Sequence, residues 1–162
     1  PGVRGPVLEW CAGKGHLGRL LAFQSGQPVL SLEWQAELCE AGERLAKRAR
    51  VPMHFVQGDA FSAQAQALVQ PQQHAVALHA CGELHMRLLQ VAAQRHTRAL
   101  SISPCCYHLI AGASYSPMSQ AAQASALRLT TQDLRMTVQE TVTAGGAGAA
   151  AAQYRADLAA GL

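Results

Sequence analysis

Val7-Leu-Glu-Trp-Cys-Ala-Gly-Lys-Gly-His-Leu-Gly18 is the stretch that decides the fold. Its first part is apolar enough for a strand, its glycines have the G-x-G-x-x-G spacing, and residues 17–23 form a helix-like segment. In α/β folds, this order lets backbone amides and a helix N-terminus approach a nucleotide-like ligand. Glycine turns are common, so the prediction depends on this context more than on the spacing itself.

The composition of the 162-residue chain fits one globular domain with an aliphatic core. Hydrophobic residues make up 49% and charged residues 14%, which excludes the disordered class. The formal net charge of +3 is compatible with a polyanionic partner but does not require one. No signal-peptide pattern or membrane-spanning run is present, so we expect no membrane association. The five cysteines, two of them adjacent, predict reduced thiols and a cytoplasmic protein.

Expected strands and helices alternate along the first two thirds of the chain. The strands are residues 6–11, 28–33, 53–57, 74–79 and 98–103; the helices are 17–23, 35–50 and 83–95, with a short helix or a loop at 60–69. This alternation predicts an α/β, Rossmann-like, mostly parallel sheet with helices on both faces. Beyond residue 108 we expect two helices, 117–127 and 130–142, and no evident C-terminal strand pair.

We assign residues 1–143 to one domain and residues 144–162 to a low-complexity tail rich in Ala and Gly. The first strand begins very close to the start of the chain, and no hairpin is evident after Leu109. We therefore expect the domain to be a piece of a longer protein.

Three carboxylates near the expected strand ends bear on the ligand. Glu33 ends the second strand, where a carboxylate accepts hydrogen bonds from ribose hydroxyls. Asp59 is placed to meet an adenine amino group, although an ordinary Gly-Asp turn explains it equally well. Glu9 would repel a pyrophosphate and suits the cationic amine of a methionine moiety; a carboxylate capping loop amides is its alternative. Together they favour S-adenosyl-L-methionine over a dinucleotide.

Three motifs together resemble a known family. They are Glu9-Trp-Cys-Ala-Gly-Lys-Gly-His16, Leu78-His-Ala-Cys-Gly82 and Ser103-Pro-Cys-Cys-Tyr-His108. The sequence resembles the class I S-adenosylmethionine-dependent methyltransferases over about residues 7–108. More narrowly, it is similar to a methyltransferase-like group with GKGH, HxCG and CCY or CCH motifs, which includes acceptor-stem tRNA 2′-O-methyltransferases.

The resemblance implies a set of cofactor-binding residues. The glycine loop would contribute Glu9, Cys11, Gly13, Lys14, Gly15 and His16. The later strand ends would contribute Glu33 and Trp34 near the ribose and Asp59 and Ala60 near the adenine, with His79, Cys81 and Gly82 beside the transferred methyl group. Cys11 is a departure, because many members of the group have glycine there.

The loops after the fourth and fifth strands carry the candidate catalytic residues. These are His79, Cys81, Cys105, Cys106, Tyr107 and His108. A histidine here can accept a proton from the acceptor, or be an ordinary loop histidine. Tyr107 can stack on a base or pack against the sheet.

The cysteines of these loops admit three interpretations. They can pack as small buried residues, or one can attack a base, as in cytosine-C5 RNA methyltransferases. The third interpretation is a metal site shared with the histidines. Adjacent cysteines are awkward for one tetrahedral ion and no Cys-x-x-Cys is present, so we predict no metal.

The sequence therefore predicts an S-adenosyl-L-methionine-dependent methyltransferase with RNA, either tRNA or rRNA, as acceptor. Protein and small-molecule acceptors stay open, and the oligomeric state is not predicted. One alternative is a nicotinamide-dependent oxidoreductase, which uses the same glycines but leaves Glu9 unexplained. Another is a non-catalytic cofactor-binding module. The basic cluster at residues 47–50 is interpreted as a solvated helix end.

Overall fold

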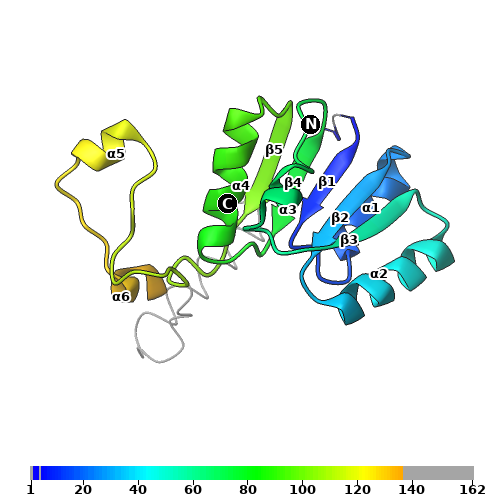
Figure 1. Cartoon of the computed structure of the whole chain (residues 1–162), viewed down its shortest axis with the longest axis horizontal. Coiled ribbons are helices and arrows are strands. Elements are labelled where there is room, and N and C mark those ends of the chain that lie inside the picture. The colour runs from blue at the N-terminus through cyan, green and yellow to red at the C-terminus, as the bar shows by residue number, and fades with distance from the viewer. Residues whose placement is uncertain (1, 4, 137–162) are drawn as a thin grey trace, which may run out of the picture.

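The computed structural model describes residues 2–3 and 5–136 of the chain. Five parallel strands form one sheet in the order β3-β2-β1-β4-β5 (Figure 1). The strands are β1 (Val7–Trp10), β2 (Val29–Glu33), β3 (Met53–Gln57), β4 (His74–Leu78) and β5 (Ala99–Ser103). The helices are α1 (His16–Ser25), α2 (Ala36–Ala49), α3 (Ala63–Gln66), α4 (Glu83–Gln94), α5 (Gln120–Ala124) and α6 (Thr131–Arg135). The predicted Rossmann-like parallel sheet is confirmed.

The sheet has helices on both faces because its strands are apolar on both sides. In β1, Val7 packs in a cluster with Ala22 of α1 and Ala46 of α2. The next residue, Leu8, faces the opposite way and packs in a second cluster with Leu88 of α4. This continuous burial of successive residues is typical of parallel strands covered on both sides.

The strand order reverses between β1 and β4. The chain moves outward from β1 through β2 to β3, then crosses to β4 on the other side of β1 and continues to β5. Ligands of open α/β sheets bind at such a switch point, outside the carboxyl ends of the strands. The loops after β1 and β4 therefore flank the expected crevice.

The segment after β5 differs from its prediction in helix length. The helix predicted at 117–127 is the five-residue α5, which has no buried residue and therefore no apolar contact to extend it. α6 begins with the predicted capping box between Thr130 and Asp133. Figure 1 shows both short helices standing apart from the sheet.

Within residues 104–136, β pairing is limited to an isolated antiparallel bridge between Ser114 and Thr130. The remainder of the helix predicted to end at residue 142 and the predicted tail, 144–162, lie outside the described residues. None of the described helices combines the length and the apolarity needed to cross a membrane.

Candidate functional site

The turn after β1 has a left-handed backbone at three positions. Cys11, Gly13 and Gly15 have φ angles of 57°, 57° and 65°. Glycine adopts this conformation without strain, which accounts physically for the glycine that the similar family often has at Cys11. A Cβ atom built on Gly13 would meet nothing within 4 Å, so this turn presents an open backbone surface. A Cβ on Gly15 would instead overlap Met53 and Phe55.

Glu9 is buried beneath the first turn of α1. Its Oε1 accepts a hydrogen bond from the Gly18 N–H at 3.0 Å, and its Oε2 accepts one from the Ser31 hydroxyl at 2.7 Å. Burial raises the pKa of Glu9, although both hydrogen bonds oppose that rise. Glu9 thus joins the first turn of α1 to β2 instead of capping loop amides, and a contact with a cofactor amine stays a prediction.

Glu33 lies at the carboxyl end of β2 and is also mostly buried. Its Oε2 accepts a hydrogen bond from the Gly13 N–H at 2.8 Å, and its Oε1 accepts one from the Gln35 N–H at 3.0 Å. One carboxylate thus holds the glycine turn against the beginning of α2.

A pocket of about 340 Å³ opens beside Glu33 at this edge of the sheet. Its lining residues are Cys11, Leu32, Glu33, Trp34, Gln35, Gly58, Asp59, Ala60, Phe61 and Leu84. The volume is in the range of small-molecule sites, roughly 300–1,000 Å³. The structure therefore brings together five of the predicted cofactor residues, from the loops after β1, β2 and β3.

Phe61 and Leu84 line this pocket but were missed by the sequence analysis. Phe61 donates its N–H to Asp59 Oδ1 at 2.9 Å, and the Arg87 guanidinium lies 5.9 Å from its ring centre. Leu84 belongs to the first turn of α4. Their positions just beyond β3 and β4 were the available signal, since such loops meet at one edge of a parallel sheet.

Of the predicted residues of the glycine loop, only Cys11 lines the pocket; Glu9, Gly13, Lys14, Gly15 and His16 lie outside its lining. Lys14 and His16 are exposed, and His16 Nδ1 lies 2.8 Å from Arg19 Nη2. Cofactor contact by Lys14 and His16 stays a prediction.

A cluster of thiols lies next to this site, where the loops after β4 and β5 meet. Cys105 Sγ lies 3.2 Å from Cys81 Sγ, 3.4 Å from Cys106 Sγ and 3.4 Å from His79 Nδ1. The hydrogen bond with His79, followed by that with Cys81, lowers the pKa of Cys105 to about 7. Burial raises the pKa of Cys81 to about 12. We call Cys81, Cys105 and Cys106 the thiol cluster.

Tyr107 and His108 do not join the thiol cluster. The Tyr107 ring meets the edge of His85 on α4, with ring centres 5.5 Å apart. His108 Nδ1 is buried and has no hydrogen-bond partner among the described residues. The structure thus groups His79 with the cysteines and directs Tyr107 toward helix α4.

Cys11 connects the pocket and the thiol cluster. Burial raises the pKa of Cys11 to about 12, and the charges of Glu33 and Cys81 act in the same direction. Because Cys11 lines the pocket and interacts electrostatically with Cys81, the pocket and the thiol cluster belong to one region of the crevice.

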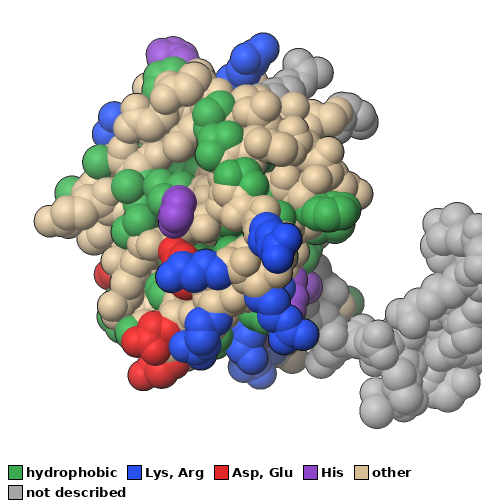
Figure 2. Space-filling view, turned by 90° about the vertical axis from the view of Figure 1, so that its right-hand side faces the viewer, with side chains coloured by type: hydrophobic (Ala, Val, Ile, Leu, Met, Phe, Trp, Pro, Cys, Tyr) green, Lys and Arg blue, Asp and Glu red, His purple; other side chains and the backbone are tan. Residues whose placement is uncertain are grey.

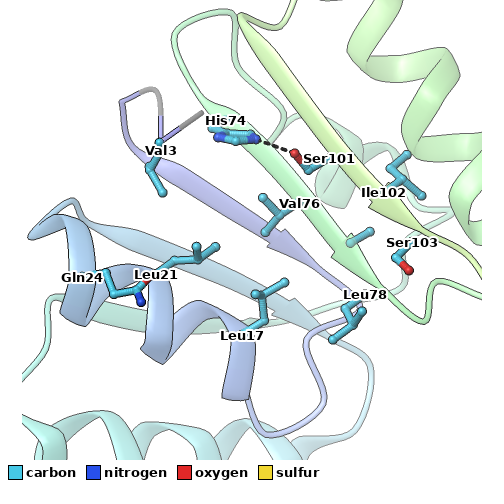
Figure 3. Close-up of a pocket in the computed structure, with 12 residues that line it drawn as sticks. Val3, Leu17, Leu21, Gln24, His74, Val76, Leu78, Ser101, Ile102 and Ser103 are labelled. Atoms are coloured by element: carbon cyan, nitrogen blue, oxygen red, sulfur yellow. Dashed lines mark hydrogen bonds between the residues drawn. The ribbon is translucent and has the colours of Figure 1, made fainter. Parts of the chain in front are cut away.

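A second pocket, of about 360 Å³, lies over β4 and β5 beside α1 (Figure 3). Figure 3 shows Leu17 and Leu21 of α1 facing Val76, with His74 hydrogen-bonded to Ser101 at 2.9 Å. None of its lining residues belongs to the predicted site. This pocket is therefore separate from the candidate site.

Basic side chains gather at the C-terminal end of α2 (Figure 2). The exposed ones there are Arg44, Lys47, Arg48 and Arg50. Helix α2 starts beside Glu33 at the pocket and runs about 20 Å to its other end, given 1.5 Å per residue. The basic cluster therefore lies at the edge of the sheet opposite the pocket.

Comparisons with known proteins agree with this fold. The model of a family described as a methyltransferase domain matches residues 4–113. The chain is similar to the Pyrococcus abyssi tRNA (uracil-54, C5)-methyltransferase in complex with S-adenosyl-L-homocysteine, at 18% identity and a TM-score of 0.52, over 62% of this chain and 24% of that one. A structure concerned with the conversion of a disulfide bond into a thioacetal group during echinomycin biosynthesis is similar at 18% identity and a TM-score of 0.51, over 62% and 44%.

This chain thus spans less than half the length of either structure. Identities at this level show a shared fold. No curated protein sequence matches the chain.

Proposed function

The chain belongs to the methyltransferase domain family, whose model matches residues 4–113, and from this premise we propose that it transfers a methyl group from S-adenosyl-L-methionine to RNA. The class I methyltransferase fold of the sheet agrees with this membership. The family implies S-adenosyl-L-methionine as the cofactor and favours it over the nicotinamide dinucleotide of the alternative function.

The pocket beside Glu33 is the observation that carries the proposal. It joins a buried carboxylate, a second carboxylate at Asp59 and the exposed indole of Trp34 at the carboxyl edge of the sheet. The open backbone surface at Gly13 is the kind of cradle that a ligand approaches closely. These residues fit a nucleoside: Glu33 would bind the ribose hydroxyls, Asp59 the adenine amino group, and Trp34 would cover the ring face.

The protein itself would mainly align the acceptor with the cofactor, because the cofactor supplies an activated methyl group on its sulfonium. Methyl transfer is an in-line displacement, so the protein gains rate by fixing the acceptor atom opposite the sulfur. His79 lies on the loop after β4 with an exposed ring. His79 would accept a proton from an acceptor hydroxyl or amine.

RNA is the acceptor class that we propose, on two grounds. The HxCG and Cys-Cys-Tyr-His motifs resemble the group that includes acceptor-stem tRNA 2′-O-methyltransferases. The net charge of +3 also suits a polyanion. The basic end of α2 is distant from the pocket, so it would contact only an RNA long enough to reach it. A cytoplasmic location agrees with the five free thiols.

Cofactor binding is tested by titrating S-adenosyl-L-homocysteine and, separately, NADH into the protein in a calorimeter. We expect binding of the first alone. Trp34 is exposed in the pocket whereas Trp10 is fully buried, so a fluorescence change on binding should disappear in Trp34→Phe. Folded protein that binds NADH and not S-adenosyl-L-homocysteine would overturn the proposal.

The acceptor is tested with cofactor labelled in its methyl group. We expect label in total cellular RNA and none in a protein extract or a metabolite extract; Glu33→Gln is the matched inactive control. Label in protein or small molecules would replace RNA as the acceptor class. Cofactor binding without transfer to any of the three would favour the non-catalytic module.

A further inference from the structure

The thiol cluster has the donor atoms of a metal site. The sulfur atoms of its three cysteines all lie within 4.8 Å of one another, and among the described residues they form a group of possible metal ligands. We propose that Cys81, Cys105 and Cys106 bind a zinc ion as thiolates, with His79 as the fourth ligand. This inference goes beyond the proposed methyl transfer and does not rest on it; with zinc bound, His79 would hold the ion instead of accepting a proton.

The distances fit tetrahedral coordination after small movements. Zinc–sulfur bonds of 2.3 Å place two sulfurs of a tetrahedral site about 3.8 Å apart. The observed separations are 3.2 Å for Cys81 and Cys105 and 3.4 Å for Cys105 and Cys106. His79 Nδ1 lies 3.4 Å from Cys105 Sγ, against about 3.5 Å in such a site. His79 does not belong to the group of ligand atoms within 4.8 Å of one another, so its exposed ring must turn toward the other two sulfurs to bind the ion.

The two adjacent cysteines have their sulfurs 3.4 Å apart, and the chain turns directly after them. The Cys106 carbonyl accepts hydrogen bonds from the N–H groups of Gly82 at 2.9 Å and Leu109 at 3.2 Å. Sequence spacing argued against a shared ion, since neighbouring side chains of an extended chain point apart. The folded backbone removes that objection.

The loops that carry the ligands are held together before any ion binds. The His79 N–H donates to the Ser103 carbonyl at 3.1 Å, which joins the ends of β4 and β5. A Cβ atom on Gly82 would overlap the Leu109 carbonyl, so the two loops pack backbone against backbone there. An ion at this point would therefore bind to a preformed site and fasten the two loops at the edge of the crevice.

The donor set selects the metal. Three thiolates and one imidazole are soft ligands that suit zinc, whereas magnesium and calcium require oxygen ligands. The same sulfurs could also be consumed in a disulfide between Cys81 and Cys105. That bond requires an S–S separation near 2.05 Å and leaves the third cysteine of the cluster without a role.

The test is a metal analysis of protein purified under a non-chelating reductant, then loaded with zinc chloride or cobalt chloride and desalted. We expect one zinc per chain, and for cobalt the intense thiolate-to-metal absorption of a tetrahedral sulfur site. Cys81→Ser, Cys105→Ser and Cys106→Ser should each lose the metal. The matched control is Cys39→Ser, a buried thiol on α2 outside the cluster.

His79→Ala tests whether His79 is the fourth ligand. We expect its zinc affinity, measured by competition with a chelator, to fall by at least about tenfold, since even outer partners of metal ligands contribute that much. Unchanged affinity would remove His79 from the site and leave three thiolates. Circular dichroism of each variant reports folding; should a serine variant unfold, the cobalt spectrum of the unsubstituted protein decides.

Folded, reduced protein with neither zinc nor a cobalt–thiolate band would overturn the metal site. So would a Cys81–Cys105 disulfide found by mass spectrometry in metal-free protein, or full zinc content in the serine variants. S-adenosyl-L-homocysteine is titrated into the same samples. Cofactor binding without metal overturns only this inference, and metal without cofactor binding overturns only the proposed function.

Discussion

The carboxylate of Glu33 accepts a hydrogen bond at 2.8 Å from the backbone N–H of Gly13, although these residues are 20 positions apart in the sequence. Glu33 ends β2, and Gly13 lies in the turn after β1. The bond couples the residue proposed to bind the ribose to the turn proposed to approach the ligand. A change at either residue should therefore affect cofactor binding before it affects the fold.

Replacing Glu33 with Gln should weaken cofactor binding. The amide keeps the shape but loses the charge, and a hydrogen bond to a charged group contributes about 1.5–3 kcal/mol. We expect the dissociation constant of S-adenosyl-L-homocysteine to rise roughly 10- to 100-fold in calorimetry. Glu40→Gln, an exposed carboxylate paired with Arg44 on α2, is the control and should bind normally. Equal affinity in both variants would contradict the ribose contact.

Alanine should destabilise the protein at both Gly13 and Gly18, but for different physical reasons. Gly13 faces open space but has a left-handed backbone, so Gly13→Ala should cost about 1–2 kcal/mol of stability and block the cofactor. Gly18 is buried in α1, where a Cβ would overlap Glu9, so Gly18→Ala should cost about 1–3 kcal/mol from overpacking. Urea unfolding and calorimetry on both variants separate the effects. Gly13→Ala with unchanged cofactor affinity would contradict the cradle.

Glu9 should give the protein a measurable pH dependence of stability. Burial raises its pKa above the ordinary value of 4.5, so between 4.5 and the raised pKa the native state keeps a proton that the unfolded state has released. The free energy of unfolding therefore falls as pH rises through that window. Glu9→Gln removes this contribution to the pH dependence of the free energy of unfolding.

We expect the unfolding free energy of Glu9→Gln minus that of the unsubstituted protein to increase through the same window and then level off. Urea titrations at a series of pH values measure this difference, in which the other ionisable groups largely cancel. A difference that stays flat with pH would mean that Glu9 has an ordinary pKa.

The sheet could be predicted from the sequence because its determinants are local. Each strand is a short apolar run closed by a turn, and the bounds of β3, Met53–Gln57, match the prediction. The helix predicted at 117–127 is much shorter, and none of the residues of α5 is buried. Helix propensity without tertiary contact supports only a short capped segment.

The site was predictable only as far as chain position determines it. Glu33 and Asp59 follow strands directly, so topology alone places them at one edge of the sheet. Whether Glu9 binds a ligand or caps a loop depends on side-chain hydrogen bonds that no spacing encodes. The convergence of Cys105 and Cys106 depends in the same way on hydrogen bonds accepted by one carbonyl.

Gly82 should be the glycine at which alanine is tolerated least. It caps α4 with φ 59° and ψ −128°, a conformation that side chains avoid, and a Cβ there would overlap the Leu109 carbonyl. In Gly82→Ala, backbone strain of about 1–3 kcal/mol and the forced separation of the two loops should both lower the stability of the protein. Gly26 is the matched control: it caps α1 with φ 66°, and a Cβ would meet nothing within 4 Å. Gly26→Ala should therefore cost only about 1–2 kcal/mol. Urea unfolding of the two variants measures the difference, and equal losses would show that the loops after β4 and β5 do not pack backbone against backbone.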